Sequence, residues 1–415
     1  MTEPTKAGWG KDARVIVLIC AAHFVSHYHL MLLPPILELV KTQFGASYLE
    51  IGVAFTAFNI VSAALQAPAG FLVDRIGPRR VLTAGLVLGA VALVFIALVP
   101  TYWALLVAYA FLGLANTVYH PADYAILSAS IDPKRIGRAF SIHTFSGYLG
   151  SGVAPSIVIL SAGLWGWSGA ALVAAAMGGV VASMLLTFGA ILVRPSPAPT
   201  TARAASTASQ SPSENGWRLL FSAPILRNLF FFMLLALSNG GLQTYGVVAL
   251  GALHGTPATI ANIALSGYLL LSAAGVLLGG VIADRTRHHQ WVATCCFVAT
   301  SAMVVLIGWV NLGAAALVVV MSAGGLLNGI IQPSRDMMVR AVTPPGSFGK
   351  VFGFVSTGFN IGGVVSPLLY ATLMDRGEPR LVFAFIVAFI LLAILTLVTR
   401  PRPATTGAPV ARPAE

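Results

Sequence analysis

The sequence is short of charge and of cysteine. Asp, Glu, Lys and Arg make up 9% of its 415 residues, whereas a typical soluble domain carries roughly 25%. The three cysteines, Cys20, Cys295 and Cys296, lie in or beside apolar stretches, so we expect no disulfide framework. No short apolar region with a small-residue cleavage site follows the polar start of the chain, which argues against a removable signal peptide. These features exclude an ordinary soluble or disulfide-stabilised protein.

Apolar stretches, by contrast, fill almost the whole chain, and 57% of its residues are hydrophobic. Each stretch has about 18 to 25 residues, the length that a helix needs to cross a hydrocarbon core of ~30 Å. Polar side chains avoid the third, sixth, ninth and twelfth stretches, which we expect to face lipid. The fold class is therefore predicted to be all-α and integral to the lipid bilayer. The twelve predicted transmembrane helices are 14–37, 50–72, 81–99, 103–127, 138–162, 168–193, 222–250, 258–282, 291–310, 313–338, 351–373 and 381–399.

The net charge of +11 is distributed unevenly along the chain. Of the 24 Lys and Arg residues, 20 lie in the termini and in connections that alternate helices place on one side. Only Lys41, Arg376 and Arg380 lie on the other side. Positive residues gather on the cytoplasmic side of membrane proteins, so both termini are predicted to be cytoplasmic. The basic character is thus a sign of topology, and we expect no nucleic-acid partner.

The chain divides into two similar halves. With a shift of 212 residues, Gly113–Pro155 aligns without a gap with Gly325–Pro367 and shares 11 identities in 43 positions. Such repeats place transport sites between two halves near the middle of the membrane. A stretch rich in Ala, Pro, Ser and Thr separates the halves, as a flexible linker would. The predicted parts are an N-terminal six-helix bundle (1–193), a cytoplasmic linker (194–217), a C-terminal six-helix bundle (218–400) and a cytoplasmic tail (401–415).

The loop after the second helix carries the run GFLVDRIGPRRVL, starting at Gly70. This run resembles the signature loop of the major facilitator superfamily, and with twelve helices in two halves the resemblance covers the whole chain. It implies two pseudo-symmetric six-helix bundles that rock about a central cavity and give alternating access. Two positions differ from the family pattern: Pro78 stands where a basic residue is common, and Arg287 replaces the second Gly of a C-terminal copy. That weaker copy, after the eighth helix, contains Gly280, Asp284 and Arg285.

A second motif comprises Tyr119, His120, Pro121, Gly137, Arg138, Gly147, Gly150 and Pro155. Within the superfamily, it resembles the fosmidomycin-resistance group of drug exporters. The run GYLGSGVAP in the fifth helix is in addition similar to the Gly- and Pro-rich motif of antiporters. The combination implies a bacterial inner-membrane protein, which we expect to be a monomer.

Histidines are the ionisable groups best placed to carry protons in these helices. Titratable side chains at membrane depth are costly and are usually functional, and imidazole changes its charge near neutral pH. His27 lies half way along the first helix, His23 lies one turn away on the same face, and His29 points elsewhere. We expect His23 and His27 to form a proton or substrate site, with a purely packing role as the alternative. No Cys or carboxylate lies near them in sequence, so we expect no metal and no cofactor.

The fourth helix carries Asn116, Tyr119, His120 and Asp123. Helical spacing puts Asn116, His120 and Asp123 on one stripe. We expect Asn116, Tyr119 and His120 to line the cavity, with His143 of the fifth helix facing His120.

Gating is predicted at the cytoplasmic ends of the helices. In the family, an acid at the position of Asp123 often pairs with basic residues of the signature loop, here Arg75 or Arg79. Asp74 is expected to join them and to hold the inner face closed. A proton-carrying role for Asp123 is the alternative. The corresponding gating residues of the second half are Asp284, Arg285 and Asp336.

In the second half, the 212-residue shift places Gln332 at His120 and Arg335 at Asp123. Arg335 is expected either to be neutralised by its neighbour Asp336 or by Asp284, or to face the cavity. In the cavity it would favour a carboxylate or phosphonate substrate. Further polar residues on the predicted cavity-lining helices are Asn59, Gln66, Asn239, Gln243, Tyr245, Tyr268, Asn328 and Asn360.

These features predict a secondary transporter for a small organic solute. No Gly-rich stretch follows a strand as a nucleotide-binding loop does, so energy is expected from an ion gradient or from the gradient of the solute. We predict proton-coupled export. The alternatives are a proton-coupled importer of an organic anion and, in another class, a membrane sensor built on a transporter scaffold. An enzyme is not expected, and the predicted partners are a small-molecule substrate, protons and lipid.

Overall fold

The computed structural model describes residues 6–132, 135–192, 218–286, 288–344 and 348–398. The predicted linker 194–217 and tail 401–415 lie outside these ranges. The regular structure of the described residues is entirely helical. The first half comprises α1 (Lys6–Leu30), the 3-10 helix η1 (Pro34–Ile36), α2 (Leu37–Phe44), α3 (Tyr48–Ile76), α4 (Pro78–Leu98), α5 (Tyr102–Ser130), α6 (Ile136–Phe188) and η2 (Gly189–Ile191).

The second half contains the remaining helices and one short π-helix. They are α9 (Ala223–Gly240), the π-helix η3 (Gly241–Tyr245), α10 (Gly246–His254), α11 (Ala258–Arg285), α12 (His289–Trp309), α13 (Ala314–Ala341), α14 (Phe348–Asp375) and α15 (Pro379–Val398).

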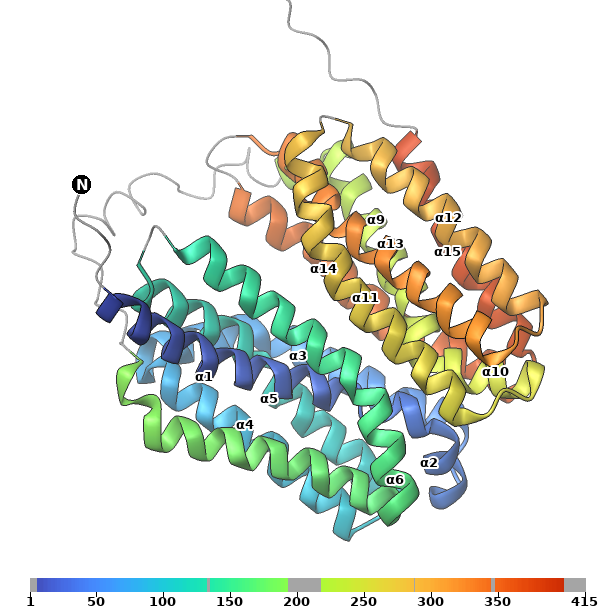
Figure 1. Ribbon diagram of the computed structural model, residues 1–415, viewed down its shortest axis with the longest axis horizontal. Coiled ribbons are helices and arrows are strands. Elements are labelled where there is room, and N and C mark those ends of the chain that lie inside the picture. The colour runs from blue at the N-terminus through green and yellow to red at the C-terminus, as the bar shows by residue number, and fades with distance from the viewer. Residues whose placement is uncertain (1–5, 133–134, 193–217, 287, 345–347, 399–415) are drawn as a thin grey trace, which may run out of the picture.

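Of the described residues, eleven helical segments are long and apolar enough to span a membrane. The sequence predicts twelve, and the difference lies in α6. Gly166 interrupts this helix with a φ of 69°, a left-handed conformation that glycine adopts without steric cost. The chain turns back there, and Figure 1 shows two separate legs on either side of the turn. The two legs correspond to the predicted helices 138–162 and 168–193.

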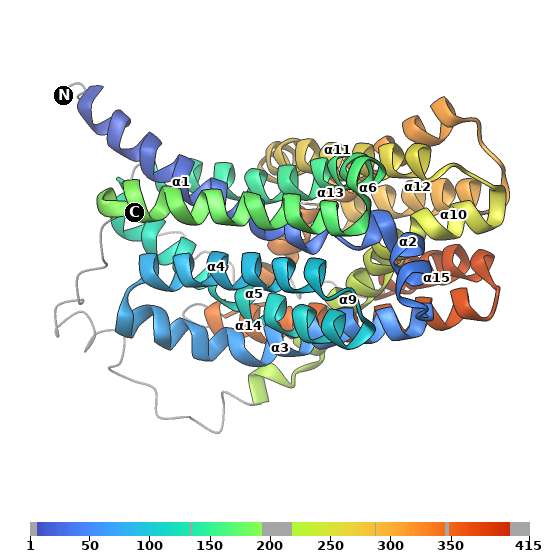
Figure 2. The ribbon, with the colours of Figure 1, turned by 90° about the horizontal axis from the view of Figure 1, so that it is seen from below.

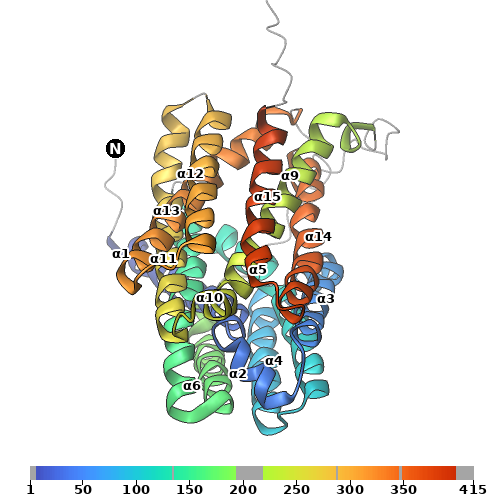
Figure 3. The same ribbon diagram turned by 90° about the vertical axis from the view of Figure 1, so that its right-hand side faces the viewer.

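The two halves lie side by side and diverge toward one end. That end, where α1 begins and α15 ends, is called here the terminal face, and the end that contains α2 and α10 is called the opposite face. Figure 1 shows the halves close together at the opposite face and splayed apart at the terminal face, and Figure 3 looks onto the opposite face, with α2 and α10 in front. In Figure 2, α2 lies next to α10, at the junction of the halves.

Repeated glycines occupy equivalent helix crossings in the two halves. A Cβ on Gly113 of α5 would lie 2.5 Å from the carbonyl oxygen of Phe58 in α3. A Cβ on Gly325 of α13 would lie 1.9 Å from the carbonyl oxygen of Tyr268 in α11. Small residues allow such backbone approaches between membrane helices. The sequence repeat therefore preserves the positions at which helices cross.

The first helix of each half is interrupted at a matching position. After α1 ends at Leu30, the chain passes into η1, and in the second half the π-helix η3 follows α9. Residues 241–245 of η3 correspond, by the 212-residue shift, to 29–33. Such π-helical turns are common at functional sites, and η3 contains Gln243 of the predicted cavity lining.

Hydrogen bonds join the two halves at the opposite face. The Asp375 carboxylate, at the end of α14, accepts from the backbone N–H groups of Tyr48 (2.9 Å) and Leu49 (2.7 Å) at the start of α3. The first N–H groups of a helix lack internal partners and carry positive partial charge, so a carboxylate is favourable there. Three further bonds cross nearby: Thr56 Oγ1 to Val364 O (3.0 Å), Asn262 Nδ2 to Pro35 O (3.0 Å) and Ser156 Oγ with Ser266 Oγ (2.9 Å).

Candidate functional site

Four histidines from three helices form one group inside the first half, named here the histidine cluster: His23 and His27 of α1, His120 of α5 and His143 of α6. The His23 ring is central. It stacks on the His143 ring with centroids 3.8 Å apart, and its centroid lies 4.6 Å from that of His27 and 5.3 Å from that of His120. The structure therefore gathers all four predicted histidines, although their roles stay predictions.

The hydrogen bonds of His23 define which of its nitrogens is free. Its Nδ1 lies 2.8 Å from the carbonyl oxygen of His143. A carbonyl only accepts, so Nδ1 carries the proton in this bond and Nε2 of the neutral ring is left as an acceptor. This Nε2 is buried and has no partner among the described residues.

Asp123 lies beside the cluster and is completely buried. Its Oδ2 accepts from His143 Nε2 at 2.9 Å, while Oδ1 is buried without a partner in the described part of the chain. A buried carboxylate is costly unless a proton or a cation accompanies it. The Asp123–His143 pair can thus hold a proton inside the first half.

A glycine makes room for the cluster on α6. A Cβ on Gly147 would lie 2.5 Å from His23 Cε1 and 2.9 Å from His27 Cδ2, closer than side-chain atoms normally approach. One turn further on, Ser151 Oγ lies 3.1 Å from His27 Nδ1. Ser151 is missing from the predicted site because serine is common in membrane helices and only the folded arrangement brings it to His27.

A cleft of about 540 Å³ lies between the two halves on the terminal side. We call it the terminal-side cleft. The Tyr124 ring lines it, and the centroid of this ring lies 5.8 Å from that of His120 and 5.6 Å from that of His143. One aromatic side chain therefore links the cleft to the histidine cluster. Other lining residues are Phe140, Ser141, Thr144, Phe145 and Tyr148 of the first half and Ala273, Val276, Leu277, Gly280, Gln332, Pro333, Arg335 and Asp336 of the second.

Arg335 both faces this cleft and pairs with its neighbour. Its Nε donates to Asp336 Oδ1 at 2.9 Å, and one terminal nitrogen lies at the same distance from that oxygen. The guanidinium carbon lies 4.8 Å from the ring centre of Phe232 and 5.2 Å from that of Phe359. Stacking on aromatic rings fixes the plane of an arginine. The two expectations for Arg335, neutralisation and cavity lining, are thus compatible.

The other predicted cavity residues divide between the halves. Asn116 Nδ2 donates to Ser62 Oγ of α3 at 2.8 Å, and Tyr119 is buried. In the second half, Tyr268 donates to Asn239 Oδ1 at 3.2 Å, and Asn328 lies with both around a small cavity. Partly buried Gln243 and exposed Asn360 complete the set, with no hydrogen bond described for either side chain.

In this conformation Asp123 is not paired with the signature loop, and the pairing expected when the inner face is closed stays a prediction. Asp123 points into the first half, toward His143. Arg79 instead donates to the carbonyl oxygens of Leu185 (3.1 Å) and Leu186 (2.8 Å). Its guanidinium thereby caps the C-terminal end of the second leg of α6. The remaining predicted gating residues of the loops, Asp74, Arg75, Asp284 and Arg285, are exposed at the terminal face, where the halves are apart.

The unusual Pro78 has a local explanation. Gly77 precedes it with a φ of 96°, and Pro78 is the first residue of α4. Proline suits this position because the first N–H of a helix has no partner within the helix.

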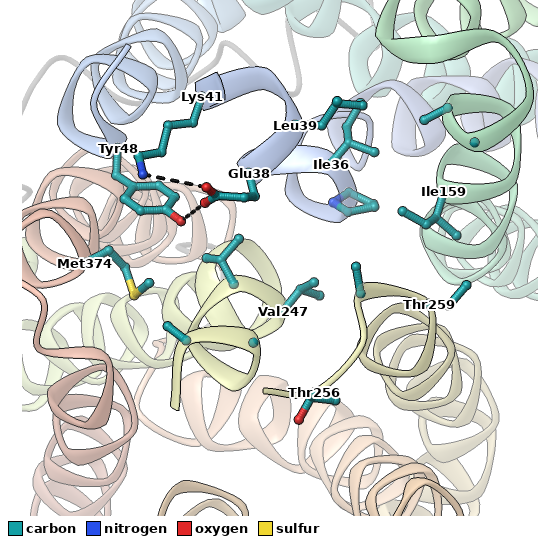
Figure 4. A pocket seen from close by; sticks show the side chains of 17 residues that line it. Ile36, Glu38, Leu39, Lys41, Tyr48, Ile159, Val247, Thr256, Thr259 and Met374 are labelled. Atoms are coloured by element: carbon teal, nitrogen blue, oxygen red, sulfur yellow. Dashed lines mark hydrogen bonds and ion pairs between the residues drawn. The ribbon is translucent and has the colours of Figure 1, made fainter. Parts of the chain in front are cut away.

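A second depression, of about 870 Å³, lies at the opposite face. Figure 4 shows that Glu38 points toward both Lys41 and the Tyr48 hydroxyl, which donates a hydrogen bond to it. Thr256, Thr259 and Met374 line its second-half side. The depression thus lies between the two halves at the opposite face, and no residue of the histidine cluster lines it.

Comparison with known proteins points to a transporter rather than an enzyme. The sequence matches the Major Facilitator Superfamily over residues 19–256 and 241–414. The chain therefore belongs to the major facilitator superfamily, as the signature loop predicts.

Individual relatives are distant but cover most of the chain. The sequence is 21% identical over 389 residues to the fosmidomycin resistance protein of Escherichia coli, with 92% of each chain covered. It is 23% identical over 402 residues to a probable sulfoacetate transporter of Cupriavidus necator, with 87% of each covered. The first of these matches confirms the predicted resemblance to the fosmidomycin-resistance group.

Solved structures share the fold at low sequence identity. A bacterial homolog of the human lysosomal transporter Spinster, described as inward-facing and unoccupied, aligns with a TM-score of 0.77 and 13% identity, over 97% of this chain and 100% of that one. The nucleoside transporter NupG aligns with a TM-score of 0.74 and 17% identity, over 94% of this chain and 98% of that one.

Proposed function

We propose that this protein exports a small organic solute in exchange for protons. The observation that carries the proposal is the histidine cluster with the buried Asp123. A single aromatic side chain, Tyr124, lies between this cluster and the terminal-side cleft. Histidine is the side chain that most readily changes its charge near neutral pH. Ionisable groups at this depth are expensive and are kept for function.

In this proposal the cluster is the proton site and the terminal-side cleft is the entry for the solute. The shared wall between them is Tyr124, which contacts the cleft on one side and His120 and His143 on the other. A change of charge in the cluster therefore reaches the cleft through one side chain. Such proximity provides the coupling that an exchanger needs between proton and solute.

The terminal face is the cytoplasmic face in this proposal. Exposed Arg75, Arg80 and Arg285 lie there, and positive residues favour the cytoplasmic side. The conformation is then inward-facing, with the exit closed by the bonds at the opposite face. Asp74 and Arg75 are proposed to act in the other state, when the terminal face closes.

Import of an organic anion is the second candidate, and Arg335 favours it. This guanidinium faces the cleft and is oriented by two phenylalanine rings. Asp336 occupies only part of its five N–H donors, so a carboxylate or similar group could bind the rest. The resemblance to a probable sulfoacetate transporter points to the same chemistry.

Transport by purified protein in liposomes separates the two candidates. Counterflow of a panel that includes fosmidomycin, sulfoacetate, sugars and hydrophobic drugs would identify the solute. A pH gradient is then imposed in each direction. Export predicts that the solute moves uphill against the inward flow of protons, and import predicts movement in the same direction as the protons.

The matched variants are His27→Gln, which alters the cluster, and His254→Gln, which alters a histidine of the second half bonded to Ile307 O. Gradient-driven transport should be lost in the first and kept in the second. Equal accumulation by both variants would remove the cluster from the mechanism. If no member of the panel shows counterflow, the result would argue against both transport candidates and would favour the membrane-sensor alternative.

A further inference from the structure

We propose that His23, His27 and His120 form a binding site for one divalent transition metal ion of the kind that imidazole favours, such as Zn²⁺. One ring nitrogen from each residue lies within 4.8 Å of the other two. In a tetrahedral zinc site with bonds of 2.0–2.1 Å, ligand nitrogens are about 3.3 Å apart. The ring nitrogens therefore need to approach one another by at most about 1.5 Å.

His23 already has the arrangement of a metal ligand. Metal-binding histidines almost always donate the N–H of their second nitrogen to a carbonyl or carboxylate, which fixes the tautomer and aims the lone pair. Here Nδ1 of His23 donates to the carbonyl oxygen of His143 at 2.8 Å. The lone pair on Nε2 is buried and has no hydrogen-bond partner in the described part of the chain.

The other two ligands come from different places in the sequence. His27 lies one turn from His23 on α1, and its Nδ1 lies 3.1 Å from Ser151 Oγ, so Nε2 is available when Nδ1 donates to the serine. His120 comes from α5, and its Nδ1 is buried without a partner among the described residues. The sequence shows only the pair on α1, whereas the fold adds the third nitrogen.

The surroundings suit a cation. The ligands themselves are neutral, but the Asp123 carboxylate lies behind His143, which stacks on His23. Gly147 leaves the space that the His23 and His27 rings occupy. Three protein ligands leave one position for water, as in open zinc sites. The other titratable side chains around the cluster are Cys20, Tyr119, Tyr124 and His143.

A bound metal ion would occupy the nitrogens that the proposed function assigns to protons. Imidazoles must be unprotonated to bind a metal, so metal and protons compete. All three ligands belong to the first half, and the ion would therefore inhibit proton coupling without joining the two halves. This consequence rests on the proposed function, whereas metal binding itself does not.

Calorimetric titration of the purified full-length protein with Zn²⁺ at neutral pH tests the site. The protein carries a tag without histidine, and size-exclusion chromatography confirms that each variant is folded. We expect one ion per chain, and loss of that ion in His23→Gln and His120→Gln. Ser151→Ala keeps all three ligands but removes the partner of His27, and it should weaken binding by roughly 10- to 100-fold.

The controls are His254→Gln and a His288→Gln/His289→Gln double variant, since the latter pair lies at the surface near the start of α12. Both should bind zinc like the wild type. Absence of zinc binding by the wild type, unchanged binding in the cluster variants, or loss of binding only in the double variant would each overturn the site. Zinc binding without proton-driven transport would instead support the site and reject the proposed function.

Discussion

The junction at the opposite face offers a quantitative test of how the halves are held together. Asp375 accepts two hydrogen bonds from the first two N–H groups of α3, at 2.9 and 2.7 Å. A helix cap contributes about 0.5–2 kcal/mol, and a hydrogen bond to a charged group about 1.5–3 kcal/mol. Because Asp375 is largely exposed, we take about 1–2 kcal/mol for its two hydrogen bonds together. This free energy changes the ratio of the conformation with a closed opposite face to that with an open one by roughly 5- to 30-fold. Asp375→Ala should therefore shift the protein toward the state with an open opposite face.

Distances between spin labels across each face measure this shift. Labels at Gln43 and Arg380 report on the opposite face, and labels at Arg80 and His288, which leave Asp74, Arg75 and Asp284 in place, report on the terminal face, in a background without the native cysteines. All four positions are exposed or next to loops. In Asp375→Ala, the two labels on the opposite face should show an additional, longer distance, and the two labels on the terminal face an additional, shorter one.

The matched control is Glu378→Ala, an exposed acid three residues further along the chain. It should leave both distance distributions as in the wild type. If Asp375→Ala also leaves them unchanged, the carboxylate does not hold the halves together. If both variants shift them equally, the effect is one of general surface charge.

Three other changes test separate parts of the structure. Asp123→Asn removes the carboxylate that accompanies His143, so transport in liposomes should lose most of its dependence on pH while counterflow continues. An unchanged pH profile would refute this. Gly325→Ala places a methyl group 1.9 Å from Tyr268 O and should destabilise the protein by about 1–3 kcal/mol in a thermal unfolding assay, whereas Gly280→Ala, where the space is open, should cost less. Arg335→Lys keeps the charge but loses the planar donor set. In a binding assay, the variant should bind anionic solutes at least several-fold more weakly and neutral solutes as the wild type does. Equal losses of affinity for both kinds of solute would argue against an anion site.

The sequence predicts the fold well because membrane helices are coded locally. Length and apolarity alone locate each span, and the predicted spans 138–162 and 168–193 form the two legs of α6 on either side of the turn at Gly166. The repeat also carries three-dimensional information. Gly113 and Gly325 match in sequence because both let a helix approach a backbone carbonyl, of Phe58 and of Tyr268.

The site is only partly predictable, because its contacts connect distant segments. Helical spacing correctly puts His23 and His27 together, but the ring of His143 and the hydroxyl of Ser151 reach them only through the packing of α6 on α1. Asp123 shows a second kind of limit. Its position at one end of a helix suggests a partner in a nearby loop, but the sequence does not show that in this conformation the carboxylate points inward to His143.

The junction at the opposite face carries no sequence motif at all. Asp375 is one acid near a helix end, and its partners are backbone N–H groups 327 and 326 residues away. Backbone donors leave no trace in side-chain identity, so only the structure identifies this contact. The acid itself, at the outer end of a predicted helix and in a chain with few acids, is the available signal.

Proton movement that accompanies solute transport tests the central claim most directly. Liposomes with a trapped pH-sensitive dye, containing the wild type, His27→Gln or His254→Gln, receive the solute identified by counterflow under zero initial pH gradient. The account predicts that the solute drives protons the opposite way in the wild type and in His254→Gln, and that His27→Gln moves solute without protons. Solute transport by the wild type with no proton movement, or undiminished proton movement in His27→Gln, would contradict it.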